Sequence, residues 1–589
     1  MNTEIRDCQN CHLKFTIEPD DFSFYEKIKV PPPTFCPQCR LQRRMTWRNE
    51  RSLYKRNCDL CKTSIISIYK PQSPFKVYCH DCFRSDTWDP LSYGRNYDFT
   101  KPFFQQFHEL QIQVPRLNLM VTDCVDSDYI NGAYHDKNCY LIFASDEDED
   151  CAYSHSIFYC KNVYDCLGVH HAEWCAGDVN CEKIFNTYYS QDCFDSYNLF
   201  FCTDCANCHD CIGCTGLRNQ SYSIFNQRYS KEEYSKRLAE MKLGTVAGFS
   251  VVYEKARQLK TNFPVKYYHG NNNLRSEGDY LFHCKASSSI FDCQNIEDSK
   301  YLYIGNRVKD SYDGYAIVDN IELNLEVISH NSSFSKFCLS YWHGTDGTYG
   351  DTCESCNNVF GCIGLRNKQY CILNKQYAKE EYEALVPKII EHMKSMPYMD
   401  RNGKQYGFGE FYPSEISPFA YNETVAQEFF PLTKSEIQKN FSWFEPENKN
   451  YKATLTSFNL PQDIKDAKDD LTKEVVECEH NGKCGDQCTS AFRLLSSELD
   501  FYRKANLPLP RLCSNCRHFG RMRSKNPLKL WHGKCQCAGE KSANGVYANT
   551  GTHSSHAKGE SCPSEFETSY SPERPEIVYC EQCYNAEVV

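Results

Sequence analysis

The fold is decided by residues 139–185, which read CYLIFASDEDEDCAYSHSIFYCKNVYDCLGVHHAEWCAGDVNCEKIF. Similar residues recur in and around this stretch every 21 positions: Cys139, Cys160, Cys181 and Cys202, and Val121, Ile142, Val163 and Ile184. A fixed period of like residues predicts a stack of equivalent coils. Aromatic and β-branched residues dominate, and so short a period leaves no room for a pair of helices. The sequence therefore predicts a mainly β fold with a central parallel β-helix of about 21 residues per coil.

A larger duplication indicates that the middle of the chain holds two such segments. Residues 213–234 recur 148 positions later, at residues 361–382, and each copy ends a solenoid segment and opens a helix. Ser230 and Glu233 form a capping box at the start of the first helix. We expect a first β-solenoid segment at 96–229, a helical cap or insertion at 230–278, a second segment at 279–377, a helix at 378–397 and a connector at 398–477.

Paired cysteines predict two metal sites in residues 1–95. Each set consists of two Cys-x2-Cys pairs joined by a loop, a spacing at which four thiolates can surround one tetrahedral zinc ion. The predicted ligands are Cys8, Cys11, Cys36 and Cys39 for the first site, and Cys58, Cys61, Cys79 and Cys82 for the second.

Residues 478–589 repeat this double module. A shift of 477 positions aligns Cys36 with Cys513, and a shift of 501 aligns Cys79 with Cys580, so a 24-residue insertion lies between the two alignments. The predicted ligands are Cys484, Cys488, Cys513 and Cys516 for the third site, and Cys535, Cys562, Cys580 and Cys583 for the fourth.

One ligand of the third site has no direct counterpart, because Cys8 aligns with Gly485. Cys484 is preferred to Cys478 because three residues separate it from Cys488, a spacing common in zinc sites. Cys537, His553 and His556 stay open as replacements for other ligands. Four-thiolate sites leave no coordination position for water, so we expect four structural zinc ions and no catalytic residues.

Basic residues lie beside the predicted metal sites. Residues 40–62 carry eight Lys or Arg and two acids, a net charge of +6, and residues 503–541 carry ten and one, a net charge of +9. Aromatic residues such as Trp47 and Trp531 are interleaved with them, a pattern typical of nucleic-acid surfaces. The candidate nucleic-acid contacts are Arg40, Arg43, Arg44, Arg48, Arg51, Arg517, Arg521 and Arg523. The alternative is that these arginines neutralise acids elsewhere in the chain.

The first solenoid segment is strongly acidic. Residues 121–213 carry three lysines and 17 acids, a net charge of −14, which argues against nucleic acid on this surface and favours a basic protein partner. The run of five cysteines from Cys202 to Cys214 could bind a metal, but the duplicate 148 positions later keeps only three of them. Stacked buried thiols are the preferred interpretation.

The expected location is the cytoplasm. The first ten residues lack the apolar stretch of a signal peptide, and no run approaches the roughly 20 apolar residues of a membrane span, so no membrane partner is expected. A reducing compartment also fits the interpretation of the cysteine pairs as metal ligands.

Three phrases carry a resemblance to a known family. They are residues 35–40 (FCPQCR), 47–51 (WRNER) and 571–580 (SPERPEIVYC). The chain resembles, over essentially its whole length, a zinc-ribbon and β-helix protein family of candidate-phylum bacteria with reduced genomes. The resemblance implies zinc-ribbon or treble-clef-like ends and implies no activity.

Three functions are compatible with these patterns. The first is a non-enzymatic zinc scaffold whose terminal modules bind nucleic acid, RNA rather than specific DNA. The second is a protein–protein scaffold in which the basic modules fold onto the acidic solenoid or onto a partner. The third is an enzyme of the carbohydrate-active β-helix or nuclease type, for which the sequence offers no paired catalytic residues.

Overall fold

The computed structural model describes residues 2–328, 331–446, 452–538, 541–542, 556 and 560–588, which form a mixed α/β protein with more strand than helix. They divide into two compact units, each assembled from distant parts of the chain. Unit 1 contains Met1–Leu119, Tyr268–Glu445 and Leu528–Leu530, and unit 2 contains Met120–Tyr267, Pro446–Pro527 and Trp531–Val589. Each unit therefore combines one cysteine-rich terminal module with one part of the repetitive middle.

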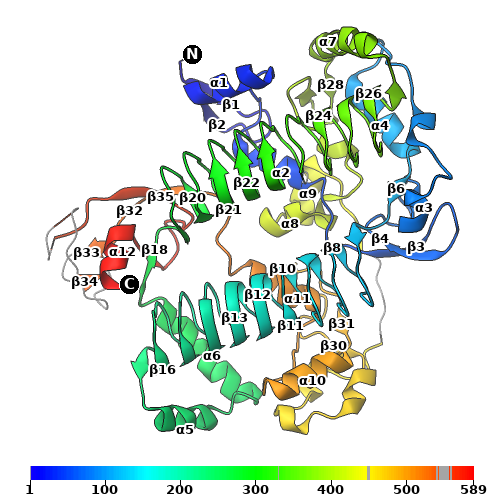
Figure 1. Ribbon diagram of the computed structural model, residues 1–589. Coiled ribbons are helices and arrows are strands. Elements are labelled where there is room, and N and C mark those ends of the chain that lie inside the picture. The colour runs from blue at the N-terminus through cyan, green and yellow to red at the C-terminus, as the bar shows by residue number, and fades with distance from the viewer. Residues whose placement is uncertain are drawn as a thin grey trace. The chain divides into compact units, whose positions relative to one another are not determined.

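The repetitive part of unit 2 is a ladder of parallel strands, drawn in cyan to green in Figure 1. The strands are β7 (Val121–Thr122), β8 (Asn131–Tyr134), β9 (Phe143–Asp146), β10 (His155–Phe158), β11 (Lys161–Tyr164), β12 (Leu167–Ala176), β13 (Val179–Tyr188), β14 (Phe194–Phe200), β15 (His209–Ile212), β16 (Ser221–Ile224) and β17 (Gln227–Arg228). Ile157 pairs with Val169, and Val169 pairs with Cys181, so each partner lies 12 positions further along the chain. Only β17 runs antiparallel to its neighbour in this ladder.

The coil length predicted from the sequence, a repeat every 21 positions, is wrong, because the ladder repeats every 12 positions. The reason lies in a shorter period of three. Buried residues such as Cys160 and Val163 occupy every third position, and the residues before them, Tyr159 and Asn162, have φ values of 59° and 54°. These left-handed residues turn the chain at regular intervals. Because 12 and 21 are both multiples of three, two residues 21 positions apart can both face the interior although they are not paired in the ladder.

Small polar side chains and thiols connect the rungs of the ladder from inside. Ser190 Oγ accepts the backbone N–H of Cys202 at 3.1 Å, and Cys181 Sγ accepts that of Cys193 at 3.4 Å, in each case from a residue 12 positions later. Buried thiols also donate to backbone carbonyls, as Cys205 does to Thr203 at 3.5 Å. The five cysteines from Cys202 to Cys214 are all buried core residues of this kind.

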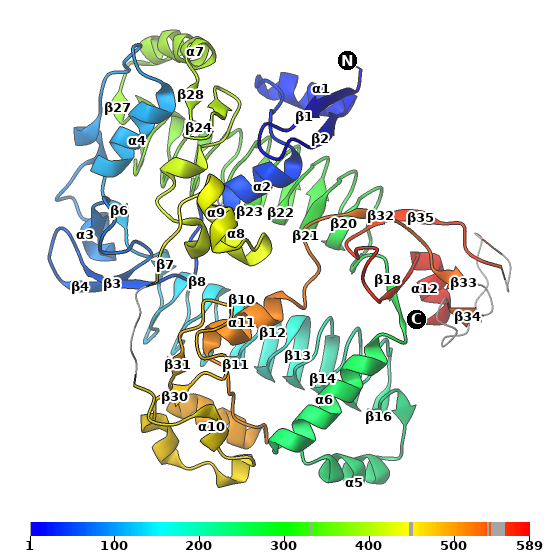
Figure 2. The ribbon, with the colours of Figure 1, turned by 180° about the vertical axis from the view of Figure 1, so that it is seen from behind.

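Unit 1 contains a second parallel ladder, visible in Figures 1 and 2. It has two sheets, with β19 (Gly270–Asn271), β20 (Gly278–Phe282), β21 (Ile290–Glu297), β22 (Tyr303–Lys309) and β23 (Tyr315–Glu322) in one, and β24 (Thr345–Thr348), β25 (Asn357–Phe360), β26 (Gln369–Ile372) and β27 (Lys375–Gln376) in the other. Phe291 pairs with Tyr303, and Tyr303 with Tyr315, again at a shift of 12. A register shift interrupts the pairing of β22 and β23 between Asn306 and Val308.

Helices follow each ladder. In unit 2 these are α5 (Lys231–Met241) and α6 (Val246–Lys260), and in unit 1 the corresponding helix is α7 (Lys379–Ser395). Ser230 caps α5 by accepting the backbone N–H of Glu233, which is one of the two hydrogen bonds of the predicted capping box. Among the helices of the described residues, none combines the length and apolar character that a membrane span requires.

The remaining elements belong to the terminal modules and the connector. In unit 1 they are β1 (Glu4–Asp7), β2 (Lys14–Ile17), α1 (Pro19–Ile28), α2 (Pro37–Met45), β3 (Tyr54–Asn57), β4 (Ser64–Ser67), β5 (Val77–Tyr78), α3 (His80–Arg84), α4 (Phe103–Gln113), β6 (Arg116–Leu117), β28 (Tyr398–Met399), β29 (Gln405–Tyr406), α8 (Val425–Phe429) and α9 (Lys434–Asn440). In unit 2 they are β18 (Pro264–Lys266), β30 (Val476–Glu477), β31 (Ala491–Phe492), α10 (Ser496–Lys504), α11 (Ser514–Met522), β32 (Trp531–Lys534), β33 (Cys537–Ala538), β34 (Lys541–Ser542), β35 (Glu565–Thr568), β36 (Ile577–Tyr579) and α12 (Glu581–Glu587).

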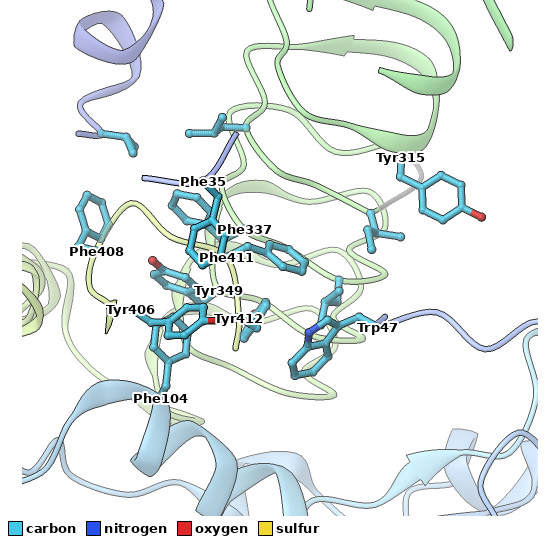
Figure 3. Packing of buried hydrophobic residues seen from close by; sticks show 14 of the residues in the cluster. Phe35, Trp47, Phe104, Tyr315, Phe337, Tyr349, Tyr406, Phe408, Phe411 and Tyr412 are labelled. Atoms are coloured by element: carbon cyan, nitrogen blue, oxygen red, sulfur yellow. The ribbon is translucent and has the colours of Figure 1, made fainter. Parts of the chain in front are cut away.

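An aromatic core joins the N-terminal module of unit 1 to its ladder, as Figure 3 shows. Trp47 of the module lies 5.0 Å from Tyr412, measured between ring centroids, and Tyr412 lies 5.6 Å from Tyr349 of the ladder. Trp47 is only 7% exposed. Its ring therefore serves packing in this structure, although the sequence placed it among the aromatic residues of a nucleic-acid surface.

Candidate metal centres and buried arginine contacts

All four predicted metal sites have the same local architecture. An antiparallel strand pair accompanies each site, and the first cysteine of each set directly follows the first strand of the pair: Cys8 after β1, Cys58 after β3, Cys478 after β30 and Cys535 after β32. The third cysteine of each set is the N-cap of a helix: Cys36 for α2, Cys79 for α3, Cys513 for α11 and Cys580 for α12. A helix N-terminus favours negative charge, so it suits a thiolate.

A hydrogen bond connects the two halves of every site. The first cysteine Sγ accepts the backbone N–H of the third cysteine at 3.2 Å from Cys36 to Cys8, 3.3 Å from Cys79 to Cys58, 3.2 Å from Cys513 to Cys478 and 3.2 Å from Cys580 to Cys535. Such bonds stabilise a sulfur that carries negative charge. The four sites are therefore built on one plan.

The sulfur positions fit a tetrahedral metal ion. A Zn–S bond of about 2.3 Å places the sulfurs of a tetrahedron about 3.8 Å apart. Neighbouring sulfurs lie 3.8 Å apart for Cys11 and Cys36, 3.8 Å for Cys61 and Cys79, 3.9 Å for Cys488 and Cys513, and 3.7 Å for Cys562 and Cys580. The four-cysteine groups are compatible with metal binding, as predicted.

The third site uses a different cysteine from the one that the sequence favoured. Its group is Cys478, Cys488, Cys513 and Cys516, whereas the prediction chose Cys484 over Cys478. The spacing from Cys488 did not identify the ligand, because the first ligand of each site is the cysteine that directly follows a strand, here Cys478 after β30. Cys484 belongs instead to an overlapping group with His480, Asp486 and Cys516.

The fourth site contains the four predicted cysteines and two further donors. His556 Nε2 lies 3.4 Å from Cys583 Sγ and 3.7 Å from Cys537 Sγ. Cys537 and His556 were both open alternatives in the sequence, and here they supplement the predicted set. His553, the third alternative, lies outside the described residues.

Each site has one cysteine whose pKa is lowered by a neighbouring hydrogen-bond donor. Thr63 lowers the pKa of Cys61 to about 6, and Cys535 lowers that of Cys580 to about 4. Hydrogen bonds from Cys36 and Cys478 lower the pKa of Cys8 and Cys513, respectively. Metal binding requires thiolates, and these contacts favour one thiolate in each site, whereas hydrogen bonding to a neighbouring cysteine raises the pKa of Cys39, Cys82, Cys516 and Cys535.

Helix α2 presents three arginines that are buried against acids of unit 1. Arg40 and Arg44 both pair with Asp313, at 2.9 Å and 3.2 Å. Arg43 pairs with Glu326 at 3.0 Å and with Glu410 at 2.8 Å. The three arginines are at most 3% exposed. They balance the three carboxylates and leave no exposed surface for a phosphate.

Helix α11 makes the equivalent contact in unit 2. Arg521 pairs with Asp165 at 3.0 Å and donates to the carbonyl of Tyr153 at 3.0 Å. Arg517 forms ion pairs with Asp165 and, at 3.2 Å, with Glu498. These side chains are also buried or nearly so, and their two positive charges balance two carboxylates.

The two contacts are copies of each other. Arg40 and Arg44 align with Arg517 and Arg521 at a shift of 477, and Asp165 aligns with Asp313 at a shift of 148. Both shifts are visible in the sequence, but neither of them pairs an arginine with an acid. The rings beside them match at the same shift of 148, because Arg40 lies 5.1 Å from the ring of Tyr301 and Arg517 lies 4.8 Å from that of Tyr153. We call this repeated contact the arginine clasp.

Aromatic residues flank both clasps in the same way. Phe24 stacks on Tyr312 with ring centroids 3.9 Å apart, and its counterpart Phe501 lies 4.5 Å from Tyr164. The N-terminal module therefore packs on the second ladder, and the C-terminal module packs on the first. Sequence reasoning had not singled out Asp165, Asp313, Glu326, Glu410 or Glu498, and the two shifts by themselves show only that Asp165 and Asp313 are equivalent positions.

Three other predicted nucleic-acid contacts lie elsewhere. Arg48 forms an ion pair with Glu50, and Arg51 lies 3.9 Å from Glu428. Arg523 pairs with Asp486 at 2.6 Å, and its side chain is 60% exposed. Of the eight arginines, it is the one whose side chain is mainly exposed.

The clasp acids are costly to bury. Burial raises the pKa of Glu326 although Arg43 and Arg44 lower it, and burial raises the pKa of Glu498 although Arg517 lowers it. The ion pairs therefore largely offset a desolvation penalty, and their main effect is to specify one docking position.

The chain matches no protein-family model and no curated protein.

Proposed function

We propose that this protein is a non-enzymatic, zinc-stabilised scaffold that works through protein contacts. The observation that carries the proposal is the duplicated clasp, in which the basic helices α2 and α11 are buried on acids of the protein's own ladders. Of the three functions considered from the sequence, this is the second. The resemblance to a candidate-phylum zinc-ribbon family and the cytoplasmic location stay predictions.

The finer architecture is part of this proposal. Each ladder is a parallel β-helix whose coils repeat every 12 positions and whose sides advance in steps of three. Support comes from further parallel bridges at the same spacing, such as Val125 to Lys137, Lys137 to Glu149 and Glu149 to Lys161. Such a coil stack is rigid and offers long side-chain rows, which suits a scaffold.

Zinc is the metal proposed for the four-cysteine groups. Four thiolates in a tetrahedral arrangement prefer zinc, and a closed site of this kind stabilises a fold. Each ion would hold a ligand hairpin against the first turn of a helix. In the first and third sites that helix is α2 or α11, which carries the clasp arginines, so metal binding and docking are coupled.

Nucleic-acid binding is the outcome that would replace this proposal. The test is a titration of the zinc-loaded full chain with single-stranded RNA and duplex DNA, starting at about 50 mM salt, where phosphate contacts are strong. We expect no salt-dependent binding. The proposal would be overturned by binding in which the logarithm of the association constant falls linearly with the logarithm of salt concentration. The variant Arg523→Gln would then show whether the exposed arginine contributes.

Hydrogen exchange provides the positive test. In the zinc-loaded chain, the amides of α2 and α11 should be strongly protected. Removal of metal should release both helices together with the ladder acids that they cover. Rapid exchange of α11 in the zinc-loaded chain would contradict docking.

A further inference from the structure

The third metal site has a longer turn between its first two ligands than either site of the N-terminal module. Cys8 and Cys11 are three positions apart, and so are Cys58 and Cys61, whereas Cys478 and Cys488 are ten positions apart. The seven extra positions contain His480, Cys484 and Asp486. All three have side chains that bind metals, and none of them is needed to complete the four-cysteine group.

The three additional donors converge on one cysteine of that group. His480, Cys484, Asp486 and Cys516 each offer a ligand atom, and these atoms all lie within 4.8 Å of one another. Cys484 Sγ is 3.6 Å from Cys516 Sγ, and Asp486 Oδ2 is 4.0 Å from His480 Nδ1. Cys516 thus belongs to two complete sets of four donors.

Two features of these donors favour a second cation. His480 Nδ1 is buried and makes no hydrogen bond among the described residues. Asp486 is 8% exposed, and its carboxylate accepts hydrogen bonds of 2.6 Å and 3.1 Å from Arg523. In metal sites, a second residue commonly orients a ligand side chain by such hydrogen bonds. A cation bound here would give the buried imidazole nitrogen a partner and would explain why it lies close to the Cys484 thiol.

We propose that the third site is a two-metal centre in which Cys516 bridges both ions. One ion is held by Cys478, Cys488, Cys513 and Cys516, and the other by Cys516, Cys484, His480 and Asp486. Five thiolates, one carboxylate and two Zn²⁺ sum to a charge of −2, and Arg523 beside Asp486 offsets part of it. The sulfur, imidazole and carboxylate donors suit zinc. The centre goes beyond the four-site scaffold and does not depend on what the scaffold binds.

The first measurement is the number of zinc ions per full-length chain, by native mass spectrometry with elemental analysis. We expect five in the wild type and four in Cys484→Ser and in His480→Ala. X-ray absorption should detect zinc–zinc scattering at about 3.5 Å in the wild type and lose it in both variants. The matched control is Ser490→Ala, which lies in the same hairpin beyond the donors and should keep five ions.

Several results would overturn the two-metal centre. Four ions in both the wild type and Cys484→Ser would mean that the extra donors bind no zinc. Four in the wild type and three in Cys484→Ser would place Cys484 in a single four-donor site. Five in both would assign the fifth ion elsewhere, with the donors Cys537 and His556 as the place to look. If the variants fold or bind zinc poorly, the wild-type protein still provides a test, because the absence of zinc–zinc scattering in it would overturn the proposal.

Discussion

Replacement of Asp165 by Asn is the sharpest test of the arginine clasp. The change keeps the side-chain volume but removes the one carboxylate that both Arg517 and Arg521 bind. Arg517 retains Glu498, and Arg521 retains the carbonyl of Tyr153. One buried positive charge is then left without a counter-charge.

Loss of one partner from a buried ion pair costs about 3–5 kcal/mol. For units of this size, about 2 °C of melting temperature corresponds to about 1 kcal/mol, so Asp165→Asn should lower the melting transition of unit 2 by about 6–10 °C. Differential scanning calorimetry of the zinc-loaded chain measures the shift, and hydrogen exchange shows whether the amides of α11 lose protection.

Two comparisons make this test specific. Asp195 is exposed on the same ladder, and Asp195→Asn should change the free energy of unfolding by less than about 0.5 kcal/mol. The double variant with Arg521→Met also removes the stranded charge and should recover much of the loss. An Asp165→Asn protein that melts with the wild type would refute the view that α11 is held by buried charge.

Three further outcomes follow from the structure. Burial, with the Asp136 charge beside it, raises the pKa of Asp148 to about 8, so its contribution to stability is complete below about pH 4 and is lost as the pH rises through about 8; urea unfolding at about pH 5 and pH 9 should show this loss in the wild type and not in Asp148→Asn. A strong zinc chelator should make α2 and α11 accessible to trypsin before the ladder strands become accessible. Cleavage of the helices and the ladder strands at the same time would contradict this prediction. A Cβ at Gly278, where φ is 152°, would lie 1.8 Å from the carbonyl oxygen of Ile290, so Gly278→Ala should destabilise unit 1 by more than about 2 kcal/mol in calorimetry, while Gly403→Ala, which meets no neighbour within 4 Å, should cost less.

The metal sites were largely predictable because their ligands are local. A hairpin turn and a helix N-terminus place cysteines by short-range geometry, and the duplication reveals most of them without any other sequence. Fifteen of the sixteen predicted cysteines belong to the four-cysteine groups of the structure. The exception, Cys484, was chosen by its spacing from Cys488, whereas the ligand position depends on where β30 ends.

The repeat length was misread for a different reason. Residues that face the ladder interior recur every third position. A comparison of the sequence with itself therefore aligns similar residues at many spacings that are multiples of three. Only the backbone pairing, such as Ile157 with Val169, identifies which multiple brings two residues into register.

The sequence by itself determined the local chemistry of this protein: four cysteine sets, two duplications, an acidic repetitive middle and basic helices at both ends. Tertiary structure alone decided where those basic helices lie. Arg40 meets Asp313 across 273 positions and Arg517 meets Asp165 across 352, and no local pattern encodes such pairings. A charged residue in a sequence signals exposure because burying it costs several kcal/mol, and only the position of its counter-charge in the fold shows where that cost has been offset.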